Sequence, residues 1–203
     1  MISIFIAKIP QTFDAQRSAE CFKKAFCGDE NLSYLQNILS RKSTASVSQS
    51  LCALTTLAEG LNALKISTTN LTLKKSQSGK PYFEGADNLF FSISHDADTV
   101  CVAISDSEVG VDIESNRHIS SQNKISARYF TKQEQTDIAE KRLDFLTVWT
   151  KREAYAKLLG TSLASTLAAE LPQDVIFYTS HNENYTFSVA SHTKNDIEIH
   201  YFS

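Results

Sequence analysis

The spacing of hydrophobic and polar residues changes several times along the chain and predicts alternating strands and helices. Residues 2–9 alternate in β-branched and apolar types, as a strand does. A mostly helical region follows to about Lys65, and its clearest amphipathic segment is residues 46–64. Between residues 71 and 114 the apolar runs are short, β-rich and separated by Gly, Asp, Asn and Ser. This part of the chain therefore predicts consecutive strands joined by tight turns.

Helical signals return after residue 120. Thr131 and Glu134 have the spacing of a capping box, in which each side chain satisfies a backbone N–H of the other residue. A long amphipathic helix is predicted from about Leu143 to Leu159, with Gly160 as its C-terminal stop.

The chain closes with three predicted strands, near residues 174–179, 185–191 and 197–202. The order strand, helices, strands is thus followed by a second set of helices and then strands, which predicts an α+β fold made of two similar halves. We place the division near residue 105, giving an N-terminal α+β half over 1–104 and a C-terminal α+β half over 105–203.

Composition narrows the classes of partner. The 203 residues are 42% hydrophobic and 21% charged, as in a globular protein, and the formal net charge is -3. With no global basic field, we expect neither nucleic acid nor an anionic membrane as partner. Because the N-terminus lacks a basic leader and no apolar run reaches roughly 18 residues, we expect a cytoplasmic protein. The four cysteines lack metal-site spacing and are expected to be reduced thiols.

Two acids stand two residues apart in the predicted strand around residue 112. Asp112 and Glu114 leave the same face of that strand, while Val111 and Ile113 indicate that the other face is buried. Two carboxylates held side by side repel, so one pKa rises unless a cation lies between them. Taken alone, the pair fits two solvated acids at a strand end better than a site.

A second group lies on the long helix, where Trp149, Glu153 and Lys157 recur every four residues and share one face. Alone, this stripe fits ordinary packing of a tryptophan beneath a favourable surface ion pair worth about 0.3–0.5 kcal/mol. Combined with the strand pair, Glu153 supplies a third carboxylate. A few hard oxygen ligands suit Mg2+ rather than Zn2+, and Mg2+ usually takes further ligands from substrate phosphates. The partner is then a phosphorylated cofactor.

A third group is the turn "GKPYF" and the strand "FSISHD". Gly79 and Pro81 frame a turn where backbone approaches a flat ligand, and Lys80 supplies a point charge to a phosphate. Ser94 and His95 form a donor pair for phosphate oxygens, although a histidine at a strand end is more often a satisfied edge residue.

The ordered set "GKPYF", "FSISHD", "VGVDIE", "RYFTKQE" and "WTKREAYAKLLG", over residues 79–160, resembles the 4'-phosphopantetheinyl transferases, in particular their larger, surfactin-type branch. Residues 1–78 and 161–203 fit only in length and element type. The resemblance implies an enzyme that moves the phosphopantetheine arm of coenzyme A to a serine of an apo acyl or peptidyl carrier protein. It also implies release of adenosine 3',5'-bisphosphate, a need for Mg2+, a pseudo-twofold α+β fold and a monomer.

The resemblance also implies roles for individual residues. The acidic metal ligands would be Asp112, Glu114 and Glu153, and Lys157 would contact the pyrophosphate. The residues that hold coenzyme A would be Gly79, Lys80, Pro81, Ser94, His95 and Lys157. Catalysis would rest on Asp112, Lys157 and Glu153, the last as metal ligand or as general base for the serine proton.

The chain departs from the family pattern at three places. Arg152 stands where a lysine is usual, Ser162 stands where a second glycine is common, and no basic cluster for the 3'-phosphate is recognisable. Arg41 and Lys42 are candidates for it by composition only, and a solvated pair of charges is the more ordinary interpretation.

Carrier proteins are generally acidic, so we expect part of the docking surface at Arg117, Lys124 and Arg128. An amphipathic helix that packs on the sheet has the same pattern. Two alternatives to the enzyme are a non-catalytic module that binds coenzyme A or carrier protein, and a different Mg2+-dependent phosphotransferase. Retention of the acids and of Lys157 argues against the first, and the lack of a Walker-type glycine loop argues against the second.

Overall fold

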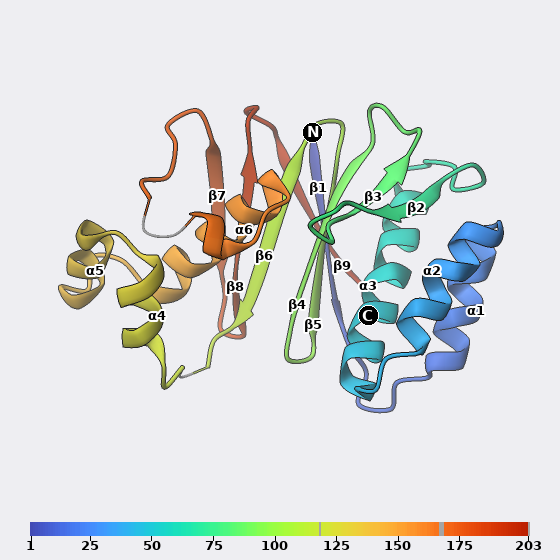
Figure 1. Ribbon diagram of the computed structural model, residues 1–203, viewed down its shortest axis with the longest axis horizontal. Coiled ribbons are helices and arrows are strands. Elements are labelled where there is room, and N and C mark those ends of the chain that lie inside the picture. The colour runs from blue at the N-terminus through green and yellow to red at the C-terminus, as the bar shows by residue number, and fades with distance from the viewer. Residues whose placement is uncertain (118, 167–168, 203) are drawn as a thin grey trace.

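The computed structural model describes residues 1–117, 119–166 and 169–202, which form a mixed α+β fold of the predicted class (Figure 1). The helices are α1 (Ala15–Ala25), α2 (Asp29–Leu39), α3 (Thr44–Ala63), α4 (Gln122–Tyr129), α5 (Lys132–Ala139), α6 (Phe145–Leu159) and the 3-10 helix η1 (Leu163–Thr166). The strands are β1 (Ile2–Lys8), β2 (Thr72–Lys75), β3 (Pro81–Glu84), β4 (Phe90–Asp96), β5 (Thr99–Ser105), β6 (Val109–Ser115), β7 (Ile176–His181), β8 (Tyr185–Ser191) and β9 (Ile197–Phe202).

The strands form three sheets among the described residues. One has the order β4-β5-β1-β9, the second is the antiparallel hairpin β2-β3, and the third has the order β6-β8-β7. The last strand, β9, returns to the first sheet and pairs parallel to β1, with Ile2 opposite Ile197. The C-terminal strand thus joins the sheet of the N-terminal half, while the division of the chain near residue 105 stays a prediction.

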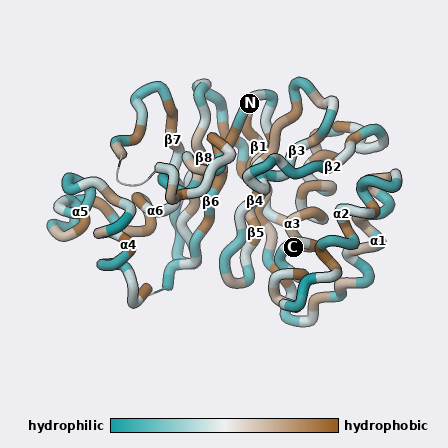
Figure 2. The backbone as a smooth tube through the Cα atoms, viewed as in Figure 1, coloured by the Kyte–Doolittle hydropathy of each residue, from teal (hydrophilic) through white to brown (hydrophobic). Residues whose placement is uncertain are grey.

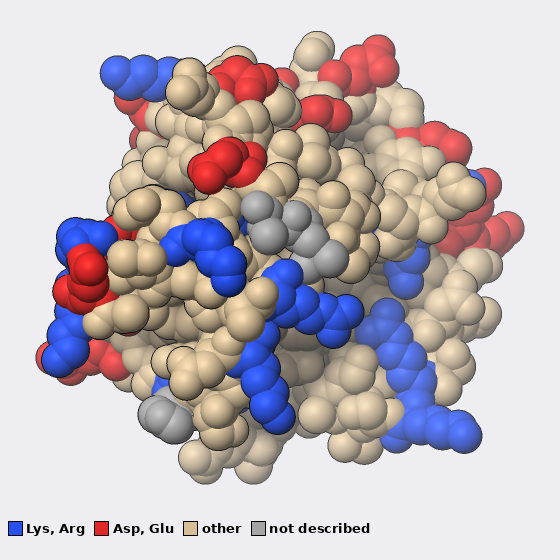
Figure 3. Space-filling view, turned by 60° about the vertical axis from the view of Figure 1, so that its left-hand side comes forward, with Lys and Arg blue, Asp and Glu red and all other residues tan. Residues whose placement is uncertain are grey.

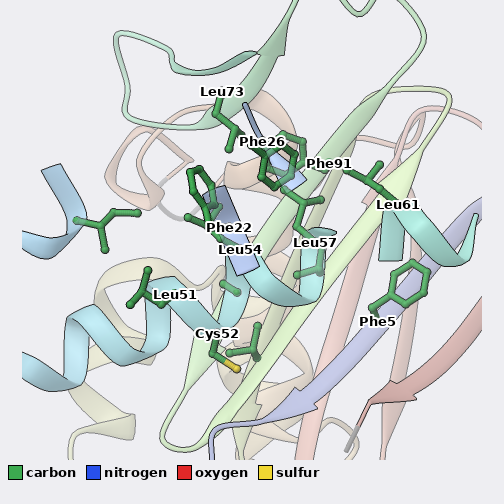
Figure 4. Close-up of a cluster of buried hydrophobic side chains, with 14 of the residues drawn as sticks. Phe5, Phe22, Phe26, Leu51, Cys52, Leu54, Leu57, Leu61, Leu73 and Phe91 are labelled. Carbon is green, nitrogen blue, oxygen red and sulfur yellow. The ribbon is translucent and has the colours of Figure 1, made fainter. Parts of the chain in front are cut away.

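Helices α1, α2 and α3 cover the first sheet on one side (Figure 1). Helix α3 is amphipathic as predicted: Leu51, Leu54, Leu57 and Leu61 are buried at helical spacing and pack in one cluster with Phe5 of β1 (Figure 4). Figure 2 shows hydrophobic stretches along the central strands, while hydrophobic and hydrophilic positions alternate along the outer helices. Burial of this cluster therefore holds α1, α2 and α3 against the first sheet.

A second core lies between the two larger sheets. Ile4 and Ile6 of β1 pack in one cluster with Val111 and Ile113 of β6 and with Phe187 of β8. Because side chains alternate along a strand, the opposite face of β6 is turned toward α6. The predicted alternation around Asp112 is thereby confirmed.

Strands β4 and β6 belong to different sheets, yet polar side chains of β4 tie them together. Ser92 Oγ accepts a hydrogen bond from the backbone N–H of Val111 at 3.1 Å, and Asp96 accepts one from the backbone N–H of Ser115 at 2.9 Å. These bonds take up backbone donors at the edge of β6 that would otherwise be unpaired. They hold β4 and β6 in a fixed register at the strand that carries the acids.

The predicted helix ends are confirmed. Thr131 and Glu134 form the full capping box of α5. Helix α6 begins after Asp144, whose carboxylate caps the N–H groups of Leu146 and Thr147, and it stops at Gly160 with φ 63°, a conformation that glycine adopts without strain. Over the described part of the chain, no helix has the length and apolarity needed to span a membrane. The four cysteines are free thiols.

Candidate active site

The two acids of β6 lie on the face of the strand that α6 covers. Asp112 is only 4% exposed, and Glu114, two residues further along the strand, is partly exposed. Gly110 precedes them on the same face, and a Cβ atom at this position would lie 2.0 Å from the carbonyl oxygen of Ala154 and 2.5 Å from the backbone nitrogen of Leu158. Only glycine therefore lets α6 pack this closely against the strand.

Asp112 forms a compact polar triangle with Lys157 and Ser94. Its Oδ1 accepts hydrogen bonds from Lys157 Nζ and from Ser94 Oγ, both at 2.7 Å, and Lys157 Nζ also donates to Ser94 Oγ at 2.7 Å. The other carboxylate oxygen, Oδ2, is buried and has no hydrogen-bond partner among the residues that the structure describes. An unpaired buried carboxylate oxygen is costly, so Oδ2 is a candidate position for a ligand such as a cation.

Glu114 is held by the tryptophan of the predicted stripe. Trp149 Nε1 donates to Glu114 Oε1 at 2.9 Å, while its ring packs with Phe130 and Phe145. Burial raises the pKa of Glu114 to about 7, against the opposing effect of the Trp149 hydrogen bond and with a smaller contribution from the negative charge of Asp112. Trp149, expected only to pack, thus also orients one of the acids.

Glu153 stands on α6 between Trp149 and Lys157 and completes the acidic group. Burial raises the pKa of Glu153, and the charge of Asp112 raises it further while Lys157 lowers it. The charges that shift the pKa of Glu153 therefore come from one residue of β6 and one residue of α6. The carboxylates Asp112, Glu114 and Glu153 line one pocket of about 470 Å³ together with Lys157. The structure therefore brings the predicted acids and lysine to one place.

The rest of the pocket lining comes from residues 34–95, and we call it the basic wall because it includes an arginine and a lysine. Gly79, Pro81, Ser94 and His95 line it, as predicted. Arg41 and Lys75 also line it. Partial desolvation and the nearby charge of Arg41 both lower the pKa of Lys75.

Sequence reasoning missed Lys75, because a lysine at a strand end resembles any solvated charge. Arg41 was a candidate by composition only. Lys42, its partner in that prediction, is not among the residues that line the pocket.

Lys80 takes a different place from the one predicted. It is not among the lining residues of the acidic pocket, and its Nζ donates to the backbone carbonyls of Val109 at 3.3 Å and Leu158 at 3.2 Å. These carbonyls belong to β6 and α6. Contact of Lys80 with a phosphate thus stays a prediction that this geometry does not support.

The two substitutions noted in the sequence lie outside the pocket lining. Arg152 is 1% exposed and pairs with Glu134, with Nη2 2.5 Å from Oε2, so it joins α6 to α5. Ser162 follows the end of α6, where its Oγ lies 3.2 Å from that of Ser165. Arg152 therefore serves the packing of the helices that carry Glu153.

The acids fit a hydrated divalent cation with few protein ligands. Over the described residues, no group of three or more His, Cys, Asp or Glu side chains is arranged to hold a metal ion by itself. Mg2+ does not require such a group, because it is usually held by one or two carboxylates, several waters and substrate phosphates. Asp112, whose Oδ2 has no partner among the described residues, and Glu114, on the same face of β6, fit such a pair of carboxylates.

Comparison with known proteins gives consistent matches. The sequence model of the 4'-phosphopantetheinyl transferase superfamily matches residues 108–202, which contain the acids and α6. The chain is similar to the 4'-phosphopantetheinyl transferase gsp of Aneurinibacillus migulanus, with 26% identity over 69% of this chain and 56% of that protein. It is 28% identical to Sfp of Bacillus subtilis over 66% of this chain and 54% of that protein. With AcpT of Salmonella typhi the identity is 33%, over 42% of this chain and 48% of that protein. The chain spans about half the length of these curated relatives.

Proposed function

We propose that this chain, whose residues 108–202 match the 4'-phosphopantetheinyl transferase superfamily, transfers the phosphopantetheine arm of coenzyme A to a serine hydroxyl of an apo carrier protein. Adenosine 3',5'-bisphosphate is the leaving product. The observation that carries this proposal is the convergence of Asp112, Glu114, Glu153 and Lys157 on one pocket. A phosphoryl transfer of this kind needs positioning and charge neutralisation more than covalent chemistry from the protein.

The proposal assigns Mg2+ to the acidic end of the pocket. Asp112 would hold it through Oδ2, the buried oxygen without a partner, and Glu114 through the carboxylate that Trp149 orients. Glu153 faces the same space and is the third candidate ligand. When bound, Mg2+ neutralises charge on the pyrophosphate.

The protein's own groups supply the rest of the chemistry. Lys157 contacts Asp112 and would stabilise the negative charge that develops on the leaving bisphosphate. Glu153 would accept the proton of the serine hydroxyl, and its raised pKa brings it nearer the value at which a general base works best at neutral pH.

The nucleotide end of coenzyme A is assigned to the basic wall. Arg41 and Lys75 would hold the 3'-phosphate, with His95 beside them, and the exposed backbone at Gly79 and Pro81 would lie against the adenine. Arg41 is pre-oriented for this task, because its Nη1 donates to Ser50 Oγ at 2.7 Å.

The carrier protein is assigned to the surface of α4. Lys124 and Arg128 are exposed there, whereas Arg117 already pairs with Asp96 at 2.8 Å; residue 118 of the predicted segment lies outside the described residues. In Figure 3, which brings the side of α4 and α5 forward, basic side chains gather around a hollow in the lower part of the face. Such a surface attracts an acidic partner.

Charge reversal tests this assignment. Lys124→Glu with Arg128→Glu is expected to raise the KM for carrier protein and to spare that for coenzyme A. The control reverses Lys23 and Lys24, which are exposed on α1 at the other end of the molecule (Figure 1). An equal effect of both reversals, or no effect of the first, would refute the assignment.

We further propose that the two halves are related by a pseudo-twofold and that the protein works as a monomer. Residues of both halves line the same pocket, from Tyr34 to His95 and from Asp112 to Lys157, which supports a complete site within one chain. Light scattering coupled to size-exclusion chromatography of the active protein tests the monomer directly.

The activity is tested by mass spectrometry of an apo carrier protein incubated with this protein, coenzyme A and Mg2+. The proposal predicts a mass increase equal to the phosphopantetheine group. Binding of coenzyme A with no mass increase across acyl and peptidyl carrier proteins would instead identify a non-catalytic binding module.

A further inference from the structure

Lys80 lies in the turn that joins β2 to β3, and its side chain reaches away from the acidic pocket. Its ammonium bridges two backbone carbonyls, that of Val109 at the first residue of β6 and that of Leu158 in the last turn of α6. Burial lowers the pKa of Lys80, while the charge of Glu108 acts in the opposite direction. The side chain is therefore inserted between the two elements and does not point into solvent.

Lys80 donates a hydrogen bond to a backbone carbonyl in the last turn of α6, where carbonyl groups have no partner within the helix. The last four carbonyls of an α-helix have no partner within the helix, and a cation near that end is favourable to the helix dipole. Lys80 provides both a donor and a charge for Leu158. Its stem also packs on the helix stop, because Lys80 Cδ would lie 3.5 Å from a Cβ atom added at Gly160.

The bridged carbonyls lie where β6 and α6 cross most closely. Gly110, next to Val109, admits the backbone of Ala154 and Leu158 at this crossing. Asp112 lies two residues beyond Gly110, and Lys157 directly precedes Leu158. A shift of α6 along β6 at this point would change the 2.7 Å contact between Lys157 and Asp112.

From this geometry we propose that Lys80 is a positioning residue, which clamps the end of α6 to the start of β6 and so sets Lys157 against Asp112. This inference rests on the proposed function for its kinetic consequence, and it differs from contact of Lys80 with the nucleotide. A ligand contact acts on coenzyme A binding, whereas a clamp acts on the alignment of groups that work in the transition state.

The kinetic test compares Lys80→Met, which keeps the packed stem, with Lys80→Arg, which keeps a charged donor. We expect Lys80→Met to lower kcat about tenfold with a KM for coenzyme A within about twofold of wild type, and Lys80→Arg to recover most of the rate. The matched control is Lys74→Met on the same hairpin, since Lys74 pairs with Glu30 and Glu84 instead. It should leave kcat unchanged.

A second measurement does not depend on transfer activity. Hydrogen exchange of the backbone amides of residues 158–161 should be faster in Lys80→Met than in Lys74→Met, because the end of α6 has lost its anchor. Equal exchange in the two variants overturns the clamp. So does a tenfold rise in the KM for coenzyme A with kcat retained, which would identify a ligand contact. If the wild type transfers no group, the proposed function fails, and the exchange experiment still decides whether Lys80 anchors α6.

Discussion

Lys157 and Asp112 are 45 residues apart in the sequence, yet the ammonium of the first lies 2.7 Å from Oδ1 of the second. This contact uses only one oxygen of the carboxylate and leaves Oδ2 buried and, among the described residues, without a partner. A lysine paired in this way balances part of the negative charge of the acids while no cation is bound. The contact therefore leaves Oδ2 available for the Mg2+ ion that we propose for this pocket.

Trp149 both packs against aromatic rings and donates a hydrogen bond to Glu114, and two substitutions separate these roles. Trp149→Phe keeps an aromatic ring against Phe145 but removes the donor to Glu114 Oε1. We expect this variant to fold with nearly wild-type stability and to need more Mg2+ for half-maximal transfer. Trp149→Ala should in addition lose stability, by less than the about 3–5 kcal/mol of a fully buried aromatic residue, because Trp149 is only partly buried. Titration of the transfer rate with Mg2+, together with urea denaturation, checks both; an unchanged Mg2+ requirement in Trp149→Phe would show that the hydrogen bond has no role.

Gly110 sets how closely α6 approaches the acids. Gly110→Ala places a Cβ atom 2.0 Å from a backbone carbonyl, which has to move, and we expect a loss of about 1–3 kcal/mol in the free energy of unfolding with a larger loss of transfer rate. Gly60→Ala is the control, because the added atom meets the Phe5 side chain at 2.8 Å and a ring can shift. If Gly60→Ala reduced transfer as much as Gly110→Ala, the close approach of α6 would not be the cause.

The elevated pKa of Glu114 predicts how stability depends on pH when Mg2+ is absent. The folded protein keeps this carboxyl protonated up to about pH 7, whereas the unfolded chain releases the proton near its ordinary pKa of 4.5. Between these values the folded state binds more protons, so the free energy of unfolding falls as pH rises through this window. Urea denaturation in EDTA from pH 5 to 8 should show this fall, and Glu114→Gln should reduce it. Identical slopes for the two proteins would mean that Glu114 does not titrate there.

Arg41 and Lys75 are expected to recognise the 3'-phosphate. Arg41→Ala combined with Lys75→Ala should weaken binding of coenzyme A by at least about tenfold, since a charge-assisted hydrogen bond contributes roughly 1.5–3 kcal/mol. Binding of dephospho-coenzyme A, which lacks that phosphate, should change far less. Lys42→Ala is the control, because Lys42 neighbours Arg41 but does not line the pocket. Calorimetric titration of the wild type, the double variant and Lys42→Ala with each of the two ligands measures these affinities, and equal losses for both ligands in the double variant would rule out the assignment.

Periodicity predicted the parts of the site that depend on which face a residue occupies. The alternation around Asp112 placed both acids of β6 on one face, and the four-residue spacing from Trp149 placed Glu153 and Lys157 on one stripe of α6. The helix stop at Gly160 followed from the conformational freedom of glycine. These features are local, because each follows from the geometry of a single strand or helix.

Contacts between distant elements were not predictable in the same way. Nothing in the sequence tells that Trp149 donates to Glu114, that Ser94 donates to Asp112, or that Lys75 comes to the same pocket. The contacts of a long flexible side chain such as that of Lys80 are still harder to predict, since it can reach several groups from one backbone position. Periodicity gives the face of an element, whereas the partner across the fold is set by how β4, β6 and α6 pack together.

The measurement that tests the central claim most directly is transfer to an apo carrier protein, followed by mass spectrometry for the wild type, Asp112→Asn and Lys157→Met in parallel. The account predicts that the wild type adds the phosphopantetheine mass in the presence of Mg2+ and coenzyme A. Each variant should remain folded by circular dichroism but lose about 2–4 kcal/mol of transition-state stabilisation, a rate loss of roughly 30-fold to 1,000-fold. Transfer by both variants at the wild-type rate would contradict the account.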